Sequence, residues 1–269
     1  MRAAVVGHVE WSRFARVERM PRRGEIVQAV DQWEQAGGGG GTAAVQLALL
    51  ADEVHLFTVL GDDRHGRAAR SELEAHGVHV HAPSDPRRTL EVFVHVEEGG
   101  ERAITTFGEK LLPRGHDDRY PWHELAGMDA VYFASGDVDA LRAARKARAL
   151  VATARELETL KRGSVALDAL VGSGEDEGER YRLGGLDPPP ALVVSTAGSL
   201  GGWMQPGGPY GAAPLPGPLV DTYGAGDCFA AGLAFGLAQG LGGATAVEFA
   251  ARCGAAAVCG RGVSPQAVH

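Results

Sequence analysis

Short apolar runs alternate with segments of helical periodicity along most of this 269-residue chain. This alternation limits the possible folds more than any other feature of the sequence. Buried strands are predicted at residues 3–6, 54–60, 130–133, 165–167 and 191–195. Helices are predicted at 40–50, 67–76, 141–160 and 227–237. Because strands that alternate with helices form mostly parallel sheets, we predict an α/β fold whose central sheet carries helices on both faces.

A second, smaller sheet is predicted where the alternation breaks down. Valines alternate with Glu91, Phe93 and His95, and the pair Gly99-Gly100 then leads into another extended segment. This pattern is typical of a β-hairpin with one solvated face. The segment 25–33 is also predicted to be extended. We therefore expect residues 10–36 and 88–107 to form a β-sheet lid on one domain, 1–269, and 207–217 to be an exposed loop.

Glycine is unusually frequent, with 39 glycines and 14 prolines in the chain. The glycine share is about twice the usual ~7%. The glycines follow no three-residue period, which excludes a collagen-like chain, and 45% of all residues are apolar. A globular protein with a large core is expected.

Charge and cysteine content restrict the partners and the compartment. The formal net charge is −8 and no basic stripe is present, so we expect no nucleic-acid partner. Cys228, Cys253 and Cys259 are too few and too clustered for a disulfide framework, and none has C-x-x-C spacing. The N-terminus lacks the pattern of a signal peptide, and no apolar run approaches ~18 residues. These features predict a cytoplasmic protein without a membrane partner.

Two histidines, His79 and His81, have the spacing of side chains on one face of a strand. Such a pair suits a metal ion, but the sequence offers no evident third ligand. The metal site is therefore left unassigned.

The segment Asp221-Thr222-Tyr223-Gly224-Ala225-Gly226-Asp227 leads into the predicted helix 227–237. Two glycines one residue apart allow a tight turn with bare N–H groups, and a helix start adds positive potential. Together they predict a site for a phosphate or another oxyanion. Asp227 would be repelled by such an anion unless it has a task, and removing a proton from an attacking hydroxyl is one. The alternative is a simple N-cap on a buried helix.

This segment resembles the D-T-x-G-A-G-D signature of the ribokinase-like (PfkB) carbohydrate kinases at every defined position. The resemblance implies that Gly224, Ala225 and Gly226 form the anion hole for the transferred phosphoryl group. It also implies that Asp227 is the catalytic base.

Further segments resemble that family in its own order. The run Gly37-Gly38-Gly39-Gly40-Gly41-Thr42-Ala43-Ala44 is similar to the family's sugar-binding G-G-x-G-x-N-x-A, although five glycines also suit a flexible linker. Gly61-Asp62-Asp63-x-x-Gly66 resembles the next family segment, and 195–201 resembles its nucleotide-contacting T-x-G-x-x-G. The resemblance implies two sets of binding residues. The substrate set is Glu10, Gly38, Gly39 and Thr42, and the nucleotide set is Thr196, Gly198, Gly201 and Thr222.

The sequence also departs from the family pattern. Thr42 replaces the usual Asn, and Glu10 stands about where the family has a substrate-binding Asp. The family's N-x-x-E segment is not found, and acidic residues where a substitute could arise are Asp168, Asp176 and Glu177. These changes leave the substrate more open than the reaction.

The resemblance implies ATP-dependent phosphorylation of a hydroxyl on a sugar or sugar-like polyol, with Mg²⁺ as a cofactor. The need for a monovalent cation stays open. A homodimer formed through the lid is expected. One alternative is a kinase for a nucleoside, a vitamin-like alcohol or a sugar phosphate, for which Arg88 and Arg102 are candidate phosphate ligands. Another is a binding protein of the same fold that has lost turnover.

Overall fold

The computed structural model describes residues 1–263 and contains a large sheet of nine strands. The strand order is β15-β14-β13-β12-β11-β10-β1-β4-β6. The strands are β1 (Arg2–Val6), β4 (Glu53–Phe57), β6 (Val78–His81), β10 (Ala130–Phe133), β11 (Ala149–Thr153), β12 (Ala169–Ser173), β13 (Val193–Thr196), β14 (Gly202–Gln205) and β15 (Gly208–Tyr210). All neighbours from β6 to β13 are parallel, and β14 and β15 are antiparallel additions. The predicted mostly parallel sheet is confirmed.

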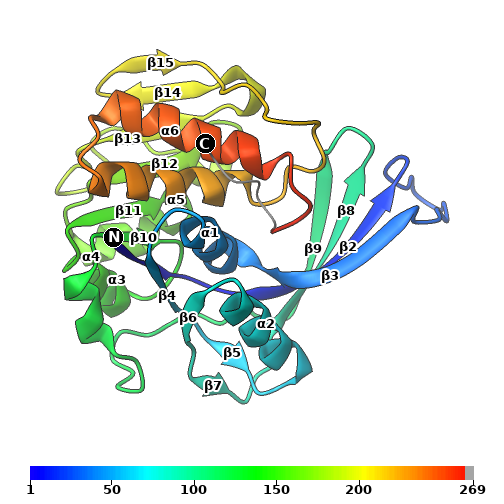
Figure 1. Ribbon diagram of the computed structural model, residues 1–269, viewed down its shortest axis with the longest axis horizontal. Coiled ribbons are helices and arrows are strands. Elements are labelled where there is room, and N and C mark those ends of the chain that lie inside the picture. Colours follow the sequence, from blue (N-terminus) through cyan, green and yellow to red (C-terminus); the bar gives the residue numbers. More distant parts are fainter. Residues whose placement is uncertain (264–269) are drawn as a thin grey trace.

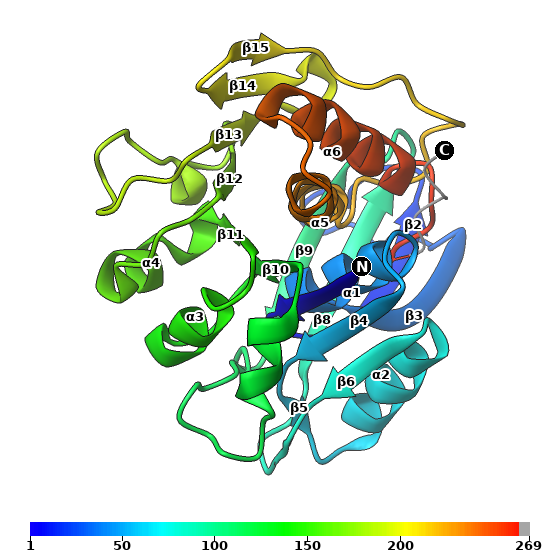
Figure 2. The same cartoon turned by 60° about the vertical axis from the view of Figure 1, so that its left-hand side comes forward.

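Helices cover both faces of this sheet, as predicted (Figure 2). One face carries α1 (Gly38–Ala48), α2 (Arg64–Ala75), α5 (Ala225–Ala238) and α6 (Gly243–Ala257). The other carries α3 (Val138–Ala144), α4 (Leu157–Gly163) and the 3-10 turn η1 (Trp122–Gly127). Alternate residues of the strands divide between two cores: Val5 and Leu56 point to the first face, Val6 and Phe57 to the second. Three short 3-10 turns are η2 (Ala154–Glu156), η3 (Glu177–Glu179) and η4 (Gly198–Leu200).

The predicted small sheet is also present and projects from the body of the molecule (Figure 1). Its order is β3-β2-β8-β9, with β2 (Glu10–Val17), β3 (Asp31–Gly37), β8 (Leu90–Glu97) and β9 (Arg102–Phe107). Val92, Val94 and Val96 are buried, as their alternation predicts. A further pair is β5 (Leu60–Gly61) with β7 (Ser84–Asp85). Among residues 1–263, no helix has both the length and the apolar character needed to cross a membrane.

The predicted helix at 141–160 is wrong. It is two short helices, α3 and α4, separated by the fully buried strand β11. The run Ala-Leu-Val-Ala-Thr fits a helix by composition, but it pairs with β10 and β12 in the interior of the sheet. A short apolar run does not by its periodicity distinguish a buried strand from a buried helix.

Other boundaries also differ from the prediction, among them the strand predicted at 54–60, which ends at Phe57 and is followed by the separate strand β5. No strand forms at 165–167, because the Asp168 carboxylate accepts the Leu150 N–H at 2.7 Å. Pairing with β11 begins only at Ala169. The segment 25–33 is mostly irregular, and β3 starts at Asp31. The loop 207–217 contains the edge strand β15, which β14 pairs with despite the flanking prolines.

Candidate active site

The site residues gather at the carboxyl ends of the parallel strands, beside the start of α5. The order of strands changes direction at β1. Its neighbour on one side is β4, and its neighbour on the other side is the later strand β10. Ligands of open α/β sheets bind at such a change of direction, outside the carboxyl ends of the strands. Gly7, which follows β1, is in close contact with Ala134, which follows β10, and with Gly40 of α1. The candidate site lies next to this contact, outside the carboxyl ends of β1 and β10.

Asp221 fixes the turn that precedes α5. One carboxylate oxygen accepts the Tyr223 N–H at 2.8 Å and the other accepts the Gly262 N–H at 2.7 Å. Burial raises the pKa of Asp221, and the two backbone hydrogen bonds oppose this shift. The first acid of the motif therefore holds the backbone and does not face the site.

Gly224 starts α5 in the left-handed region, with φ 73°. A Cβ there would lie 2.5 Å from Thr42 Cγ2, so glycine is required both by the dihedral angle and by the packing against α1. No side chain caps the helix. An added Cβ at Gly226 would meet no atom within 4 Å, so the backbone there borders open space. Free first-turn N–H groups beside open space fit the phosphates of ATP.

Asp227 lies in this first turn and points toward α1. Its Oδ1 accepts a hydrogen bond from the Tyr132 hydroxyl at 3.2 Å and would lie 3.0 Å from a Cβ built on Gly39. Burial raises its pKa, and the neighbouring His8 and Tyr132 oppose the shift. A raised pKa brings a carboxylate nearer to the value that suits a general base at neutral pH.

The glycine run 37–41 is not a flexible linker. It is the last residue of β3 and the first turn of α1, and four of the five glycines are buried. Gly40 packs so closely on Gly7 and His8 that an added Cβ would lie 2.7 Å from their backbone atoms. Gly39 alone is partly exposed, and it is the one beside Asp227. The structure thus brings the predicted sugar-binding glycines and the predicted base together.

Glu10 and Tyr223 form a buried pair next to these glycines. The Tyr223 hydroxyl donates to Glu10 Oε1 at 2.8 Å and accepts the Gly38 N–H at 2.9 Å. Burial by itself would raise the pKa of Glu10, but His8 and Tyr223 stabilise the charged form and the pKa ends below its usual value. Thr42 is also buried, and its hydroxyl has no hydrogen-bond partner among the described residues. No sequence pattern predicted these contacts of Tyr223 and His8, because Glu10 and Tyr223 are 213 positions apart.

The predicted nucleotide residues divide into two pairs. Thr196 ends β13, and Gly198 follows with φ 52° and open space at its Cβ position. These two border the site. Gly201 is buried, and its backbone packs against the carbonyl oxygen of Tyr210, which is sufficient reason for glycine there. The Thr222 hydroxyl donates to Gly100 O at 2.9 Å and accepts from Arg102 at 2.7 Å, which ties the turn before α5 to the β8–β9 hairpin.

Two acidic residues of η3 stand where the missing N-x-x-E segment was expected. Asp176 and Glu179 have D-x-x-E spacing, a signal that the sequence search overlooked by requiring Asn. Arg155 contacts both carboxylates, at 2.9 and 2.5 Å. Glu179 also accepts the Ser173 N–H at 2.8 Å, and its charge raises the pKa of Asp227. Carboxylate oxygens next to a phosphate site fit Mg²⁺.

The other two acidic candidates have different surroundings. Asp168 precedes β12 at the amino end of the strand and pairs with Arg145 at 2.7 Å. The side chain of Glu177 is 88% exposed. Asp176 and Glu177 both follow the carboxyl end of β12, and of the two only Asp176 pairs with Arg155.

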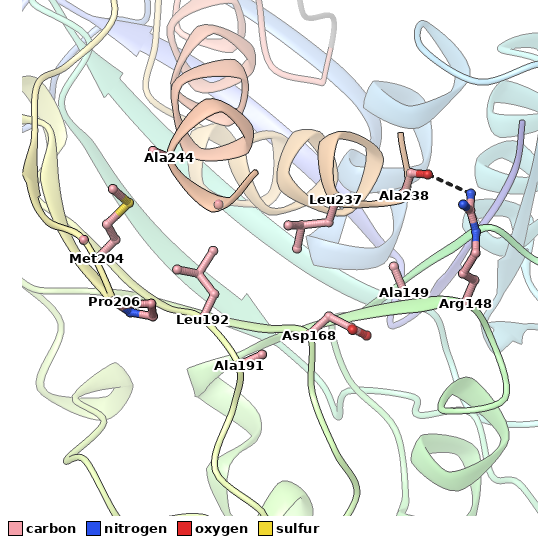
Figure 3. Close-up of a pocket in the computed structure, with 12 residues that line it drawn as sticks. Arg148, Ala149, Asp168, Ala191, Leu192, Met204, Pro206, Leu237, Ala238 and Ala244 are labelled. Atoms are coloured by element: carbon pink, nitrogen blue, oxygen red, sulfur yellow. Dashed lines mark hydrogen bonds between the residues drawn. The ribbon is translucent and has the colours of Figure 1, made fainter. Parts of the chain in front are cut away.

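Two hollows border the central sheet. One, of about 280 Å³, is lined by Ser173, Glu179 and Ser195 at the carboxyl ends of β12 and β13. The other, of about 570 Å³, lies at the opposite end of α5 between Leu192, Met204 and Leu237 (Figure 3). Asp168 lines it, and none of the predicted catalytic, nucleotide-binding or substrate-binding residues does.

Comparison with known proteins agrees with this arrangement. The chain matches the pfkB family carbohydrate kinase model over residues 2–171 and 167–268. It is 30% identical over 274 residues to an ATP-dependent ribose-1-phosphate kinase of Halopiger xanaduensis, covering 95% of this chain and 91% of that protein. It is 25% identical over 289 residues to a ribokinase of Bacillus subtilis, covering 96% and 93%.

The fold is similar to that of a solved ribokinase from Thermotoga maritima, with a TM-score of 0.74, 19% identity and coverage of 98% of this chain and 96% of that one. Sequence and fold therefore agree over nearly the whole length. Because the family model spans almost every residue and a full-length relative is 30% identical, the chain belongs to the PfkB family of carbohydrate kinases and is a phosphotransferase.

Proposed function

We propose that this protein transfers the γ-phosphoryl group of ATP to a hydroxyl of a sugar or a sugar-like polyol, with Asp227 as the base. The observation that carries the proposal is the place of the Asp227 carboxylate, between the uncapped first turn of α5 and the bare backbone of Gly39. A phosphate fits on one side of it and an approaching hydroxyl on the other. Pentoses are the first candidates, because the relatives above are a ribokinase and a ribose-1-phosphate kinase.

In this mechanism Asp227 removes the proton of the acceptor hydroxyl. The acceptor oxygen forms a bond to the γ-phosphorus while the bond from that phosphorus to the bridging oxygen breaks, and ADP leaves. The backbone of Gly224, Ala225 and Gly226 stabilises charge on the transferred oxygens. Mg²⁺ supplies further charge neutralisation when it is bound with the nucleotide. Asp176 and Glu179 would hold it.

The remaining predicted residues fall on either side of Asp227. On the acceptor side, Gly38 and Gly39 offer backbone, and Thr42 offers a buried hydroxyl that needs a partner. Glu10 orients Tyr223 at the edge of this region. Thr196 and Gly198 contact the nucleotide, while Gly201 and Thr222 act by positioning the turns that carry them.

Asp227→Asn tests the proposal. It removes the base but keeps the side-chain shape, so we expect turnover to fall at least ~100-fold while ATP affinity changes little. Steady-state kinetics with ribose and calorimetric titration of ATP measure the two quantities. Asp139→Asn, at an exposed position on α3, is the control and is expected to leave turnover unchanged. Near-normal turnover in Asp227→Asn would exclude this carboxylate as the base.

A phosphorylated sugar is a second candidate acceptor, because cationic side chains lie near the acceptor region. The charge of Lys110 helps to lower the pKa of Glu10, after the larger effects of His8 and Tyr223. Arg102 reaches the turn before α5 through Thr222. The backbone of the other arginine considered from the sequence, Arg88, lies next to Gly61.

Comparison of ribose with ribose 1-phosphate separates the two acceptors. If the acceptor carries a phosphate, kcat/KM is higher for ribose 1-phosphate, and Lys110→Gln lowers that value without changing the value for ribose. Equal kcat/KM values in the wild-type protein, with no selective effect of Lys110→Gln, would count against the phosphorylated acceptor.

A further inference from the structure

A cluster of histidines and glutamates lies on the face of the large sheet opposite α5. His55 on β4 and His81 on β6 belong to adjacent parallel strands, and their rings stack with centroids 5.0 Å apart. Glu124 of η1 reaches the same point from the loop that covers this face. His81 also packs against Phe57, a member of the core on this face. The cluster is thus separated from Asp227 by the sheet, and the proposed kinase mechanism does not use it.

Three potential ligand atoms converge within this cluster. His55 Nδ1 lies 2.8 Å from His81 Nε2 and 3.2 Å from Glu124 Oε2, and the last two atoms are 3.9 Å apart. Ligand atoms about 2.0–2.1 Å from a tetrahedral Zn²⁺ are separated by about 3.4 Å. The three distances bracket this value, so an ion fits between the atoms with small rotations of the side chains.

A second carboxylate holds His55 in the orientation that such a site needs. Its Nε2 lies 2.6 Å from Glu53 Oε1, and Arg2 binds Glu53 through two hydrogen bonds of 3.0 and 3.1 Å. A carboxylate oxygen accepts hydrogen bonds, so His55 Nε2 carries the proton and donates it to Glu53 Oε1. The lone pair is thereby left on Nδ1, facing the other two ligands. Metal-binding histidines are commonly oriented by a carboxylate in this way.

His81 and Glu124 can be reached from solvent. The side chain of His81 is 22% exposed and that of Glu124 is 32% exposed, so an ion has a path to the cluster. The third histidine, His79, groups with His55 and Glu53 instead of with His81 and Glu124.

We propose that His55 Nδ1, His81 Nε2 and Glu124 Oε2 bind one divalent transition-metal ion, with Zn²⁺ the best fit to two imidazoles and one carboxylate. A water molecule completes the tetrahedron. The ion joins three segments, which are β4, the edge strand β6 and η1. No disulfide among the described residues links them. Its role is to stabilise this edge of the sheet, independently of phosphoryl transfer.

The test uses tag-free, chelator-treated full-length protein titrated with ZnCl₂ by calorimetry and with CoCl₂ by visible absorption. We expect one equivalent of Zn²⁺ to bind, the intense visible absorption of tetrahedral Co²⁺, and a rise in melting temperature of several degrees at saturation. His81→Gln and Glu124→Gln each remove one ligand from a different element and should abolish the Co²⁺ spectrum. Glu53→Gln should weaken Zn²⁺ binding by about 10–100-fold.

Two further variants locate the ion. His76→Gln carries the same substitution at an exposed histidine on the end of α2 and should bind as the wild type does. Glu179→Gln removes a carboxylate from the proposed Mg²⁺ site and should also keep the Zn²⁺ site. The proposal is overturned if the wild type shows no saturable binding, if both ligand variants bind with wild-type affinity, or if binding is lost in Glu179→Gln alone. Melting of each metal-free variant checks that it is folded.

Discussion

Tyr223 occupies the variable position of the seven-residue motif and joins the two halves of the proposed site. Its ring packs edge-on against Phe14 of the small sheet, with centroids 5.1 Å apart. Its hydroxyl contacts Glu10, Ser12 and Gly38. Burial, followed by the charge of Glu10, raises its pKa well above the usual value, so the hydroxyl stays protonated and keeps donating to Glu10.

Tyr223→Phe is expected to lower the free energy of unfolding by about 1–3 kcal/mol, because it leaves a buried carboxylate and a buried N–H group without their partner. It should also raise the KM for the acceptor more than the KM for ATP. Thermal unfolding and steady-state kinetics measure these effects. Tyr210→Phe is the matched control, since the Tyr210 hydroxyl is buried without a partner among the described residues. Equal effects of the two substitutions would contradict the assigned role.

Asp227 gives a prediction with a defined pH dependence. Burial raises its pKa in the folded protein, so folding favours the protonated form. The contribution of this group to stability is therefore present at acid pH and is lost as the pH rises through the raised pKa. Asp227→Asn does not titrate, and its melting temperature relative to wild type should increase between about pH 4 and pH 8. If the melting temperature of Asp227→Asn relative to wild type falls over this range, the predicted direction of the pH dependence is wrong.

At the scale of elements, the start of α5 and the start of α1 are built against each other. Gly224 needs its left-handed dihedral angle, and the atom that excludes a side chain there is Thr42 Cγ2. The two predicted binding segments are thus also packing partners. This contact explains why position 224 carries no side chain.

Gly224→Ala should destabilise the protein by about 2–4 kcal/mol, the sum of a strained backbone and a crowded contact. Thr42→Ser deletes Cγ2, so the double variant should recover the part of the loss that is due to crowding, measured by chemical unfolding of all four proteins. Gly226→Ala is the control, because it has an ordinary helical backbone and open space, and its stability should not fall. Strict additivity of Gly224→Ala and Thr42→Ser would show that the contact is not the cause.

At the scale of the whole molecule, the small sheet ends on one side in the exposed edge strand β9. All six residues of β9 are exposed, among them Ile104 at 45% and Phe107 at 58%. An exposed edge with apolar side chains favours pairing with another strand. We propose that a second copy of the chain pairs here and forms a homodimer through the small sheet.

The double variant Ile104→Lys with Phe107→Lys should convert the dimer to a monomer, because charges on an edge strand oppose edge-to-edge pairing. Sedimentation at micromolar concentration measures the mass of both proteins. Leu183→Lys, at another exposed apolar residue, controls for the added charge and should remain dimeric. A wild-type protein that sediments as a monomer rules out this assembly.

Local sequence patterns were sufficient to predict the central features of the fold. The alternation of strands and helices, the β8–β9 hairpin and the turn into α5 each depend on neighbours within a few residues. Such patterns also placed Asp227 and the glycine run 37–41 at one site through their resemblance to a family. They failed at 141–160, where burial between two strands decided the structure of β11.

Contacts between distant residues were decided only by the tertiary structure. Glu10 and Tyr223 are 213 positions apart. The two partners of His81 in the proposed metal site, His55 and Glu124, come from β4 and η1. The alternating sequence determined that a parallel sheet with helices on both faces would form, because periodicity is a local property. The partners of each buried polar group were determined by the order of strands in that sheet, because strand order brings together residues that no local pattern relates.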